Sequence, residues 1–145
     1  MKRRTFLFAA AVFALPARSQ TPHVSRIDAL VWSLTKGADV TPGKVKLTLP
    51  ALAESGHSVE MSVRVDSPMT EKEHVRAIHL IAEKNPVREM ASYYFGARAG
   101  RAEVSSRVRL GRSQRVVAIA ELSDGSFWSD AVQVEVGEPA CGEDA

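Results

Sequence analysis

Hydrophobic and polar residues alternate along most of this chain, which is the period expected of half-buried β-strands. Residues 45–49, for example, read Val-Lys-Leu-Thr-Leu. Similar segments, separated by turn residues, recur further along the chain: 59–66, 78–82, 93–95, 102–110 and 132–136. Residues 116–122 are almost wholly apolar, as expected of a central strand buried on both faces. With about seven such strands, the pattern predicts an all-β antiparallel sandwich, because two stacked sheets bury one face of every strand.

A short amphipathic helix is expected before the strands. Its apolar residues recur at helical spacing: Val24, Ile27, Leu30, Val31 and Leu34. Lys36-Gly37 then marks a helix end, and Thr41-Pro42-Gly43 marks a turn. Asn85-Pro86 predicts another turn, and Asp124-Gly125 predicts a hairpin. After Val136 the alternation stops, so residues 137–145 are expected to form a flexible tail.

The chain has 145 residues, of which 45% are hydrophobic and 25% are charged. This balance is typical of one globular domain and argues against disorder. Apolar runs are too short for a span, so we expect no membrane-spanning helix.

The first residues have the features of an export signal and are not expected to belong to the domain. Lys2, Arg3 and Arg4 form a basic start, residues 6–15 are apolar, and small residues follow up to Ser19. The adjacent arginines favour the twin-arginine route, with ordinary secretory export as the alternative. We therefore expect residues 1–19 to be removed on the way to the periplasm.

Removal of this segment changes the charge of the protein. The full chain has 19 basic and 17 acidic residues and a net charge of +2. Four basic residues and no acidic ones lie in residues 1–19, so the remainder carries about −2, and nucleic acid is not an expected partner. A local basic cluster is left, which is either a set of solvated strand faces or a docking surface for an anion or an acidic partner. Its members are Arg98, Arg101, Arg107, Arg109, Arg112 and Arg115.

Cys141 is the one cysteine of the chain, so it cannot form an internal disulfide. It is a free thiol, an intermolecular bridge or a covalently loaded site. A thiol on a short flexible arm can enter the buried sites of several enzymes in turn, and those enzymes can supply its activation. The arm argument taken alone does not separate such a carrier from a stray surface thiol or an intermolecular disulfide.

Catalytic and metal sites are not expected in the domain itself. The four histidines, His23, His57, His74 and His79, show no metal-ligand spacing and are interpreted as solvated turn and strand residues. Signatures of serine hydrolases, phosphate-binding loops and paired catalytic carboxylates are also missing. We expect no cofactor, no metal and no enzymatic activity of the isolated chain.

Several segments resemble the SoxY family of thiosulfate-oxidation carrier proteins. The segments are residues 46–56 with Leu52-Ala53-Glu54-Ser55-Gly56, residues 63–70 with Asp66-Ser67-Pro68-Met69, Glu83-Lys84-Asn85-Pro86, residues 106–110, residues 114–121 and Asp124-Gly125. The family usually ends in Gly-Gly-Cys-Gly-Gly, where this chain has Pro139-Ala140-Cys141-Gly142-Glu143.

The resemblance implies an immunoglobulin-like sandwich over residues 20–136, including the helix. It implies that Cys141 is the covalent sulfur acceptor and that Gly137, Pro139, Ala140 and Gly142 form the arm presenting it. It further implies a heterodimer with a SoxZ-like sandwich subunit. The enzymes it implies as partners are a c-type cytochrome complex, a dimanganese sulfate hydrolase and a molybdenum sulfane dehydrogenase.

Two other functions stay open on the residues. The chain could be a structural periplasmic module whose cysteine forms an intermolecular disulfide. The second is a thiol reductase or peroxidase, although the chain has no second cysteine to resolve an intermediate.

Overall fold

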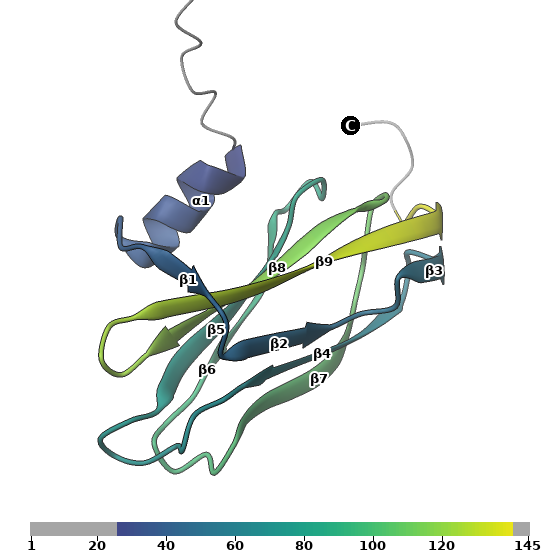
Figure 1. Ribbon diagram of the computed structural model, residues 1–145. Helices are drawn as coiled ribbons and strands as arrows, with labels where there is room; N and C mark the ends of the chain where they lie inside the picture. Colours follow the sequence, from purple (N-terminus) through teal and green to yellow (C-terminus); the bar gives the residue numbers. More distant parts are fainter. Residues whose placement is uncertain (1–25, 141–145) are drawn as a thin grey trace, which may run out of the picture.

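The computed structural model describes residues 26–140, which form one helix and nine strands in two stacked sheets (Figure 1). Helix α1 spans Arg26–Thr35. The strands are β1 (Val40–Pro42), β2 (Val45–Thr48), β3 (Leu52–Ser55), β4 (Val59–Val65), β5 (Val75–Ala82), β6 (Glu89–Tyr94), β7 (Ala102–Val108), β8 (Gln114–Leu122) and β9 (Phe127–Glu138). The expected export signal, Cys141 and Gly142 lie outside the described residues.

The larger sheet has the order β1-β9-β8-β5-β6, with β3 also paired to β9. Strand β8 lies between β5 and β9 and is antiparallel to both. Its alternate residues Val116 and Ala118 face the core between the sheets, while Val117 and Ile119 face the helix side. The prediction of a central strand buried on both faces is therefore confirmed for this segment.

The smaller sheet has the order β2-β4-β7, with antiparallel pairing throughout. Along β4, Val59, Met61 and Val63 are buried while Glu60 and Arg64 are exposed. This alternation buries one face of the sheet against the larger sheet, as the sequence predicted. The immunoglobulin-like sandwich expected from the resemblance is thus the observed fold.

Helix α1 covers part of the outer face of the larger sheet. Leu30, Val31 and Leu34 pack against a small second core formed by Ile81, Ile119 and Phe127. The helix ends as expected, because Lys36 and Gly37 adopt the left-handed conformation that stops a helix, with φ of 54° and 80°. No helix among the described residues is long and apolar enough to span a membrane.

Two strands were not predicted, and both are parallel to β9. Strand β1 occupies the segment interpreted as a turn, and pairs Val40 with Phe127. Strand β3 pairs Ala53 with Val136. Each strand has at most one buried position, so neither produces an alternating pattern. The expectation of a purely antiparallel sandwich is therefore wrong at these two places.

The strand directions bring particular connections together at each end of the sandwich. The end of β9, the β3–β4 connection, the β5–β6 connection and the β7–β8 connection gather at one end, which we call the carboxyl end. The β6–β7 and β8–β9 connections lie at the opposite end. The residue that precedes Cys141 therefore lies at the same end of the sandwich as three connections of the fold.

Candidate functional site

Strand β9 carries the chain to the residue before Cys141. Gly137 and Glu138 belong to this strand, and Pro139 and Ala140 follow it. The boundary expected at Val136 is therefore wrong for Gly137, which was placed in the presenting arm but lies inside the sheet. The strand continues because β3 pairs with it as far as Glu138. The last arm residue, Gly142, and the acceptor Cys141 lie outside the described residues.

Three segments meet at this point and hold the chain end by backbone hydrogen bonds. The amide of Gly56 donates to the carbonyl of Glu138 over 2.7 Å. The amide of Leu110 donates to the carbonyl of Gly56 over 2.9 Å, and the amide of Ala140 donates to the carbonyl of Leu110 over 3.2 Å. We call this set of four residues the anchor. It fixes the residue that immediately precedes the cysteine.

Gly56 is at the centre of the anchor because nothing larger fits there. An added Cβ would lie 2.1 Å from the carbonyl oxygen of Leu110 and 3.1 Å from the amide nitrogen of Ala140. The first distance is far inside van der Waals contact, and both neighbours are backbone atoms that take part in the anchor. A glycine is therefore required for the three segments to approach one another.

A buried amide network supports the β7–β8 side of the anchor. Gln114 is fully buried; its Oε1 accepts from the amide of Lys84 over 2.7 Å, and its Nε2 donates to Asn85 Oδ1 over 2.8 Å. Asn85 in turn donates to the carbonyl of Arg109 and accepts from the amide of Gly111, each over 2.9 Å. These bonds tie the β5–β6 connection to the β7–β8 connection on both sides of Leu110. A satisfied buried network of this kind makes a loop rigid.

Sequence reasoning noted the segments that contain Gly56, Asn85 and Gln114 but gave these residues no role. The available signal was the resemblance, which covers all three. Their contacts join segments far apart in the chain, so no local pattern could assign them.

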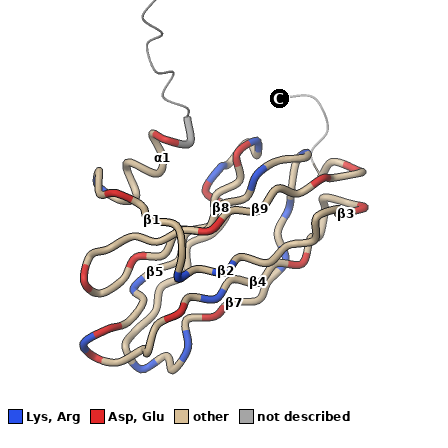
Figure 2. Tube along the Cα trace, in the orientation of Figure 1, with Lys and Arg blue, Asp and Glu red and all other residues tan. Residues whose placement is uncertain are grey.

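The basic cluster seen in the sequence is divided by the structure. Arg107 donates to Glu60 over 2.6 Å, and Arg115 forms an ion pair with Glu83. Arg98 and Arg101 lie in the β6–β7 connection at the opposite end. The remaining two, Arg109 and Arg112, lie beside Leu110 in the anchor. Figure 2 shows basic segments of the β7–β8 connection next to the point where the chain continues toward Cys141.

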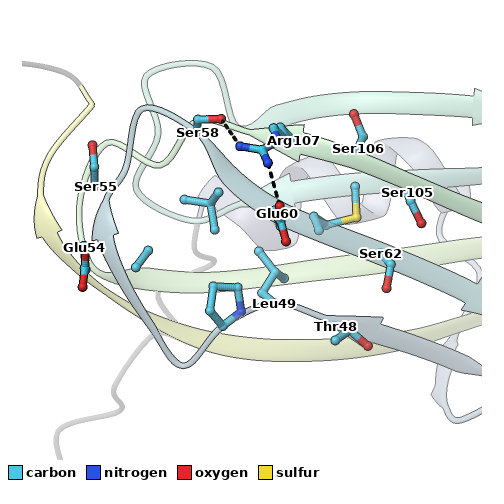
Figure 3. A pocket seen from close by; sticks show the side chains of 14 residues that line it. Thr48, Leu49, Glu54, Ser55, Ser58, Glu60, Ser62, Ser105, Ser106 and Arg107 are labelled. Carbon is cyan, nitrogen blue, oxygen red and sulfur yellow. Dashed lines mark hydrogen bonds and ion pairs between the residues drawn. The ribbon is translucent and has the colours of Figure 1, made fainter.

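A groove borders the anchor on the side of the smaller sheet (Figure 3). It has a volume of about 980 Å³ and an apolar floor that includes Leu49, Ala53 and Met61. Hydroxyl groups surround it, from Thr48, Ser55, Ser58, Ser62, Ser105 and Ser106. Ser55 pairs with Glu138 across β3 and β9, so the groove lies directly beside the strand that leads to the cysteine.

The histidines in the described part do not form a metal site. No group of three or more potential ligands occurs between residues 26 and 140. His79 is buried, so the expectation that it is solvated is wrong: it lies on β5, and its Nδ1 is 2.7 Å from Ser92 Oγ on β6. Ser92 also donates to Glu89, which completes a polar contact between the two strands. This cluster is on the sheet that carries the helix and is separate from the anchor.

The arrangement at the carboxyl end therefore fixes the backbone as far as Ala140, next to the basic β7–β8 connection and the groove lined by hydroxyl groups. Among the described residues it contains no group of side chains that could hold a metal ion. The reactive group nearest to it in the sequence is the thiol of Cys141, which follows Ala140. A thiolate can attack a sulfur atom or accept one in a covalent bond.

Comparison with known families gives one match to a family model. The model described as "Sulfur oxidation protein SoxY" matches residues 33–141, so the matched region ends at the cysteine. No curated protein matches the chain.

Several solved structures share the fold. The sulfur carrier protein SoxY from Chlorobium limicola f thiosulfatophilum aligns with a TM-score of 0.65 and 20% identity, over 76% of this chain and 90% of that one. The superoxide reductase (neelaredoxin) from Ignicoccus hospitalis has a TM-score of 0.57 and 18% identity, over 77% and 93%. The superoxide reductase from Nanoarchaeum equitans has a TM-score of 0.56 and 12% identity, over 66% and 100%. At these identities the structural matches show a common fold and nothing about activity.

Proposed function

Because the chain belongs to the SoxY family of sulfur oxidation proteins, we propose that it carries sulfur covalently on Cys141 and presents it to sulfur-oxidising enzymes. The observation that supports this most directly is the anchor. Ala140 is hydrogen-bonded to Leu110, and the cysteine is the next residue in the chain. A thiol attached one residue beyond a fixed point can be offered to a partner from a defined position.

The proposed loading step joins thiosulfate to the thiol. The outer sulfur of thiosulfate bonds to the sulfur of Cys141, a proton leaves the thiol, and two electrons pass to a c-type cytochrome complex. Water then cleaves the bond between the terminal sulfonate and the inner sulfur at a dimanganese hydrolase, which releases sulfate and leaves a persulfide on Cys141. A molybdenum dehydrogenase takes electrons from the remaining sulfane sulfur, which gains oxygen from water and becomes a sulfonate on Cys141. Hydrolysis of that sulfonate releases a second sulfate and restores the thiol. The metals belong to these partners, and this chain contributes the covalent acceptor.

The proposal includes a location and a second subunit. Residues 1–19 would direct the chain to the periplasm, and a SoxZ-like sandwich would pair with it as a heterodimer. The covalent link matters because it keeps a reactive sulfur intermediate at a high effective concentration for successive enzymes. In this proposal, each enzyme binds to the surface of the rigid sandwich.

The proposal is tested by Cys141→Ser in cells grown on thiosulfate. The intact mass of the purified wild-type protein should include adducts that a thiol reductant removes, and the variant should lack them. The urea midpoint of the variant should equal that of the wild type, because residue 141 is not one of the four residues of the anchor.

Other outcomes identify the competing functions. A wild-type protein that forms a disulfide-linked dimer on a non-reducing gel, with no sulfur adduct, would show the structural module instead. Consumption of peroxide by the isolated protein would show a thiol peroxidase. Either result contradicts the carrier.

A further inference from the structure

Three basic residues lie around the anchor without a carboxylate partner. They are Lys84, Arg109 and Arg112, and we call them the basic rim. All three are exposed, and none forms an ion pair with any acidic residue in the described part of the chain. Arg107 and Arg115, by contrast, are neutralised by Glu60 and Glu83. The uncompensated positive charge of the arginine cluster at this end is therefore concentrated in the rim.

The rim is attached to a rigid part of the fold. The ammonium of Lys84 donates to the carbonyl of Ser113 over 3.1 Å, which places its charge against the β7–β8 connection. Arg109 is held through its carbonyl by Asn85, and Gly111, next to Arg112, is held through its amide by the same side chain. Ser113 also accepts a hydrogen bond at Oγ from the amide of Val136 over 2.9 Å, which links this connection directly to β9.

The anchor links the rim to the residue that precedes the cysteine. Arg109 and Arg112 lie one residue before and two residues after Leu110, whose carbonyl accepts from Ala140. Consecutive Cα atoms are about 3.8 Å apart, so the cysteine is one such step from the anchored residue. Acidic residues also occur at this end, namely Glu54 on β3 and Glu135 and Glu138 on β9, and Glu143 and Asp144 follow Cys141 in the sequence. The rim therefore supplies unpaired donors for an anion without making the whole end positive.

We propose that the basic rim binds the oxyanion end of sulfur species that approach Cys141 or are carried on it. This inference rests on the proposed carrier function. The donors of a guanidinium match the oxygens of a sulfonate or sulfate group in geometry and charge. Basic groups near a reaction site also raise the local concentration of anions and hence their rate of attack. The rim thereby selects anionic sulfur compounds over neutral ones.

The test compares two disulfide reagents that differ in charge. One is the dianionic disulfide of thionitrobenzoic acid, and the other is the uncharged disulfide of pyridinethiol. In both reactions the thiolate of Cys141 attacks one sulfur and the disulfide bond of the reagent breaks. The other half leaves as the yellow thionitrobenzoate or as the ultraviolet-absorbing thiopyridone. The reaction rate is measured at low and at high salt with the protein that comprises residues 20–145.

The expected result is a selective loss of rate. Arg109→Gln combined with Arg112→Gln should slow the dianionic reagent about tenfold at low salt and change the rate with the uncharged reagent by less than about twofold. High salt should remove most of the difference. Arg109→Lys with Arg112→Lys should retain most of the wild-type rate, because the charge is kept.

The matched control is Arg98→Gln with Arg101→Gln, which removes the same charge from the opposite end of the sandwich. Its rates should equal those of the wild type with both reagents. The proposed anion binding by the rim would be contradicted if the rim variant slowed both reagents equally or slowed neither. The same slowing by the control variant would also contradict it. A wild-type Cys141 that reacts with neither reagent would overturn the carrier function itself, and the rim with it.

Discussion

Gly137 lies on β9, and Gly56 directly follows β3, the strand paired with β9. At each glycine, an added Cβ would lie close to backbone atoms. The added atom would be 2.1 Å from the carbonyl oxygen of Leu110 at Gly56 and 2.9 Å from that of Glu54 at Gly137. The sequence suggested that Gly137 gives the arm its freedom. In the structure it instead allows β9 to approach β3 closely, so the same glycine has a packing role.

Gly56→Ala should therefore weaken the fold at the carboxyl end. Because the obstructing atom is a backbone oxygen, the three anchor segments must move apart, at a cost of about 1–3 kcal/mol in the free energy of unfolding. Urea denaturation measures the change. Gly96→Ala is the control, since nothing lies within 4 Å of its added Cβ and its φ is not positive. Equal stability of both variants would contradict the proposed role of Gly56.

Gln114 is the second single residue on which the anchor depends. Gln114→Met keeps the size of the side chain but leaves the amide of Lys84 without its acceptor. We expect a loss of about 1–3 kcal/mol in the free energy of unfolding, together with faster hydrogen exchange at Lys84 and Gly111. Gln133→Met on the exposed face of β9 should change neither quantity. Unchanged exchange at both amides in the Gln114 variant would show that the network does not hold the connection.

At the level of elements, alternation predicted the strands that have one buried face and enough length to show it. Strands β2 and β4 alternate as expected, and β8 is apolar because its two faces are covered by the second sheet and by α1. Strands β1 and β3 were missed because they are short and mostly exposed, and are held by backbone bonds to β9 that no side-chain pattern reports. Thr41-Pro42-Gly43 has turn composition, but only Gly43, with φ of 118°, has turn geometry.

The β8–β9 turn makes a pH-dependent contribution to stability. Asp124 accepts hydrogen bonds from the hydroxyl of Ser126 at 2.6 Å and from its amide at 2.8 Å, and these bonds lower the pKa of the carboxyl below 3.8. A lowered pKa in the folded state means that this contribution is present above pH 3.8 and is lost as the pH falls through the folded pKa.

Asp124→Asn should reduce the stability more at neutral pH than at a pH below the folded-state pKa of Asp124. The stabilities of the wild type and the variant should therefore converge in acid. Thermal unfolding across this range measures the effect. Asp39→Asn is the control, because Asp39 is exposed and its side chain has no hydrogen-bond or ion-pair partner among the described residues. A constant difference between wild type and the Asp124 variant at all pH values would contradict the role of the carboxylate.

For the whole molecule, the sequence predicted the sandwich and the helix and singled out Cys141 as the candidate functional residue. The SoxY family model matches the chain as far as that residue. It did not predict how the fold holds the residue before that cysteine. The anchor joins Gly56, Leu110 and Ala140, which come from the β3–β4 connection, the β7–β8 connection and the end of β9. Contacts between such distant segments follow from the topology, and in particular from the parallel pairing of β3 with β9.

That parallel pairing has a consequence for the order in which the molecule is assembled. Leu52 is synthesised long before its partner Glu135, and the loop between them is most of the domain, so this pair closes late. A chain in which this pair has not yet formed lacks the fixed backbone that precedes Cys141. Positioning of the residue before Cys141 is thus coupled to completion of the sandwich.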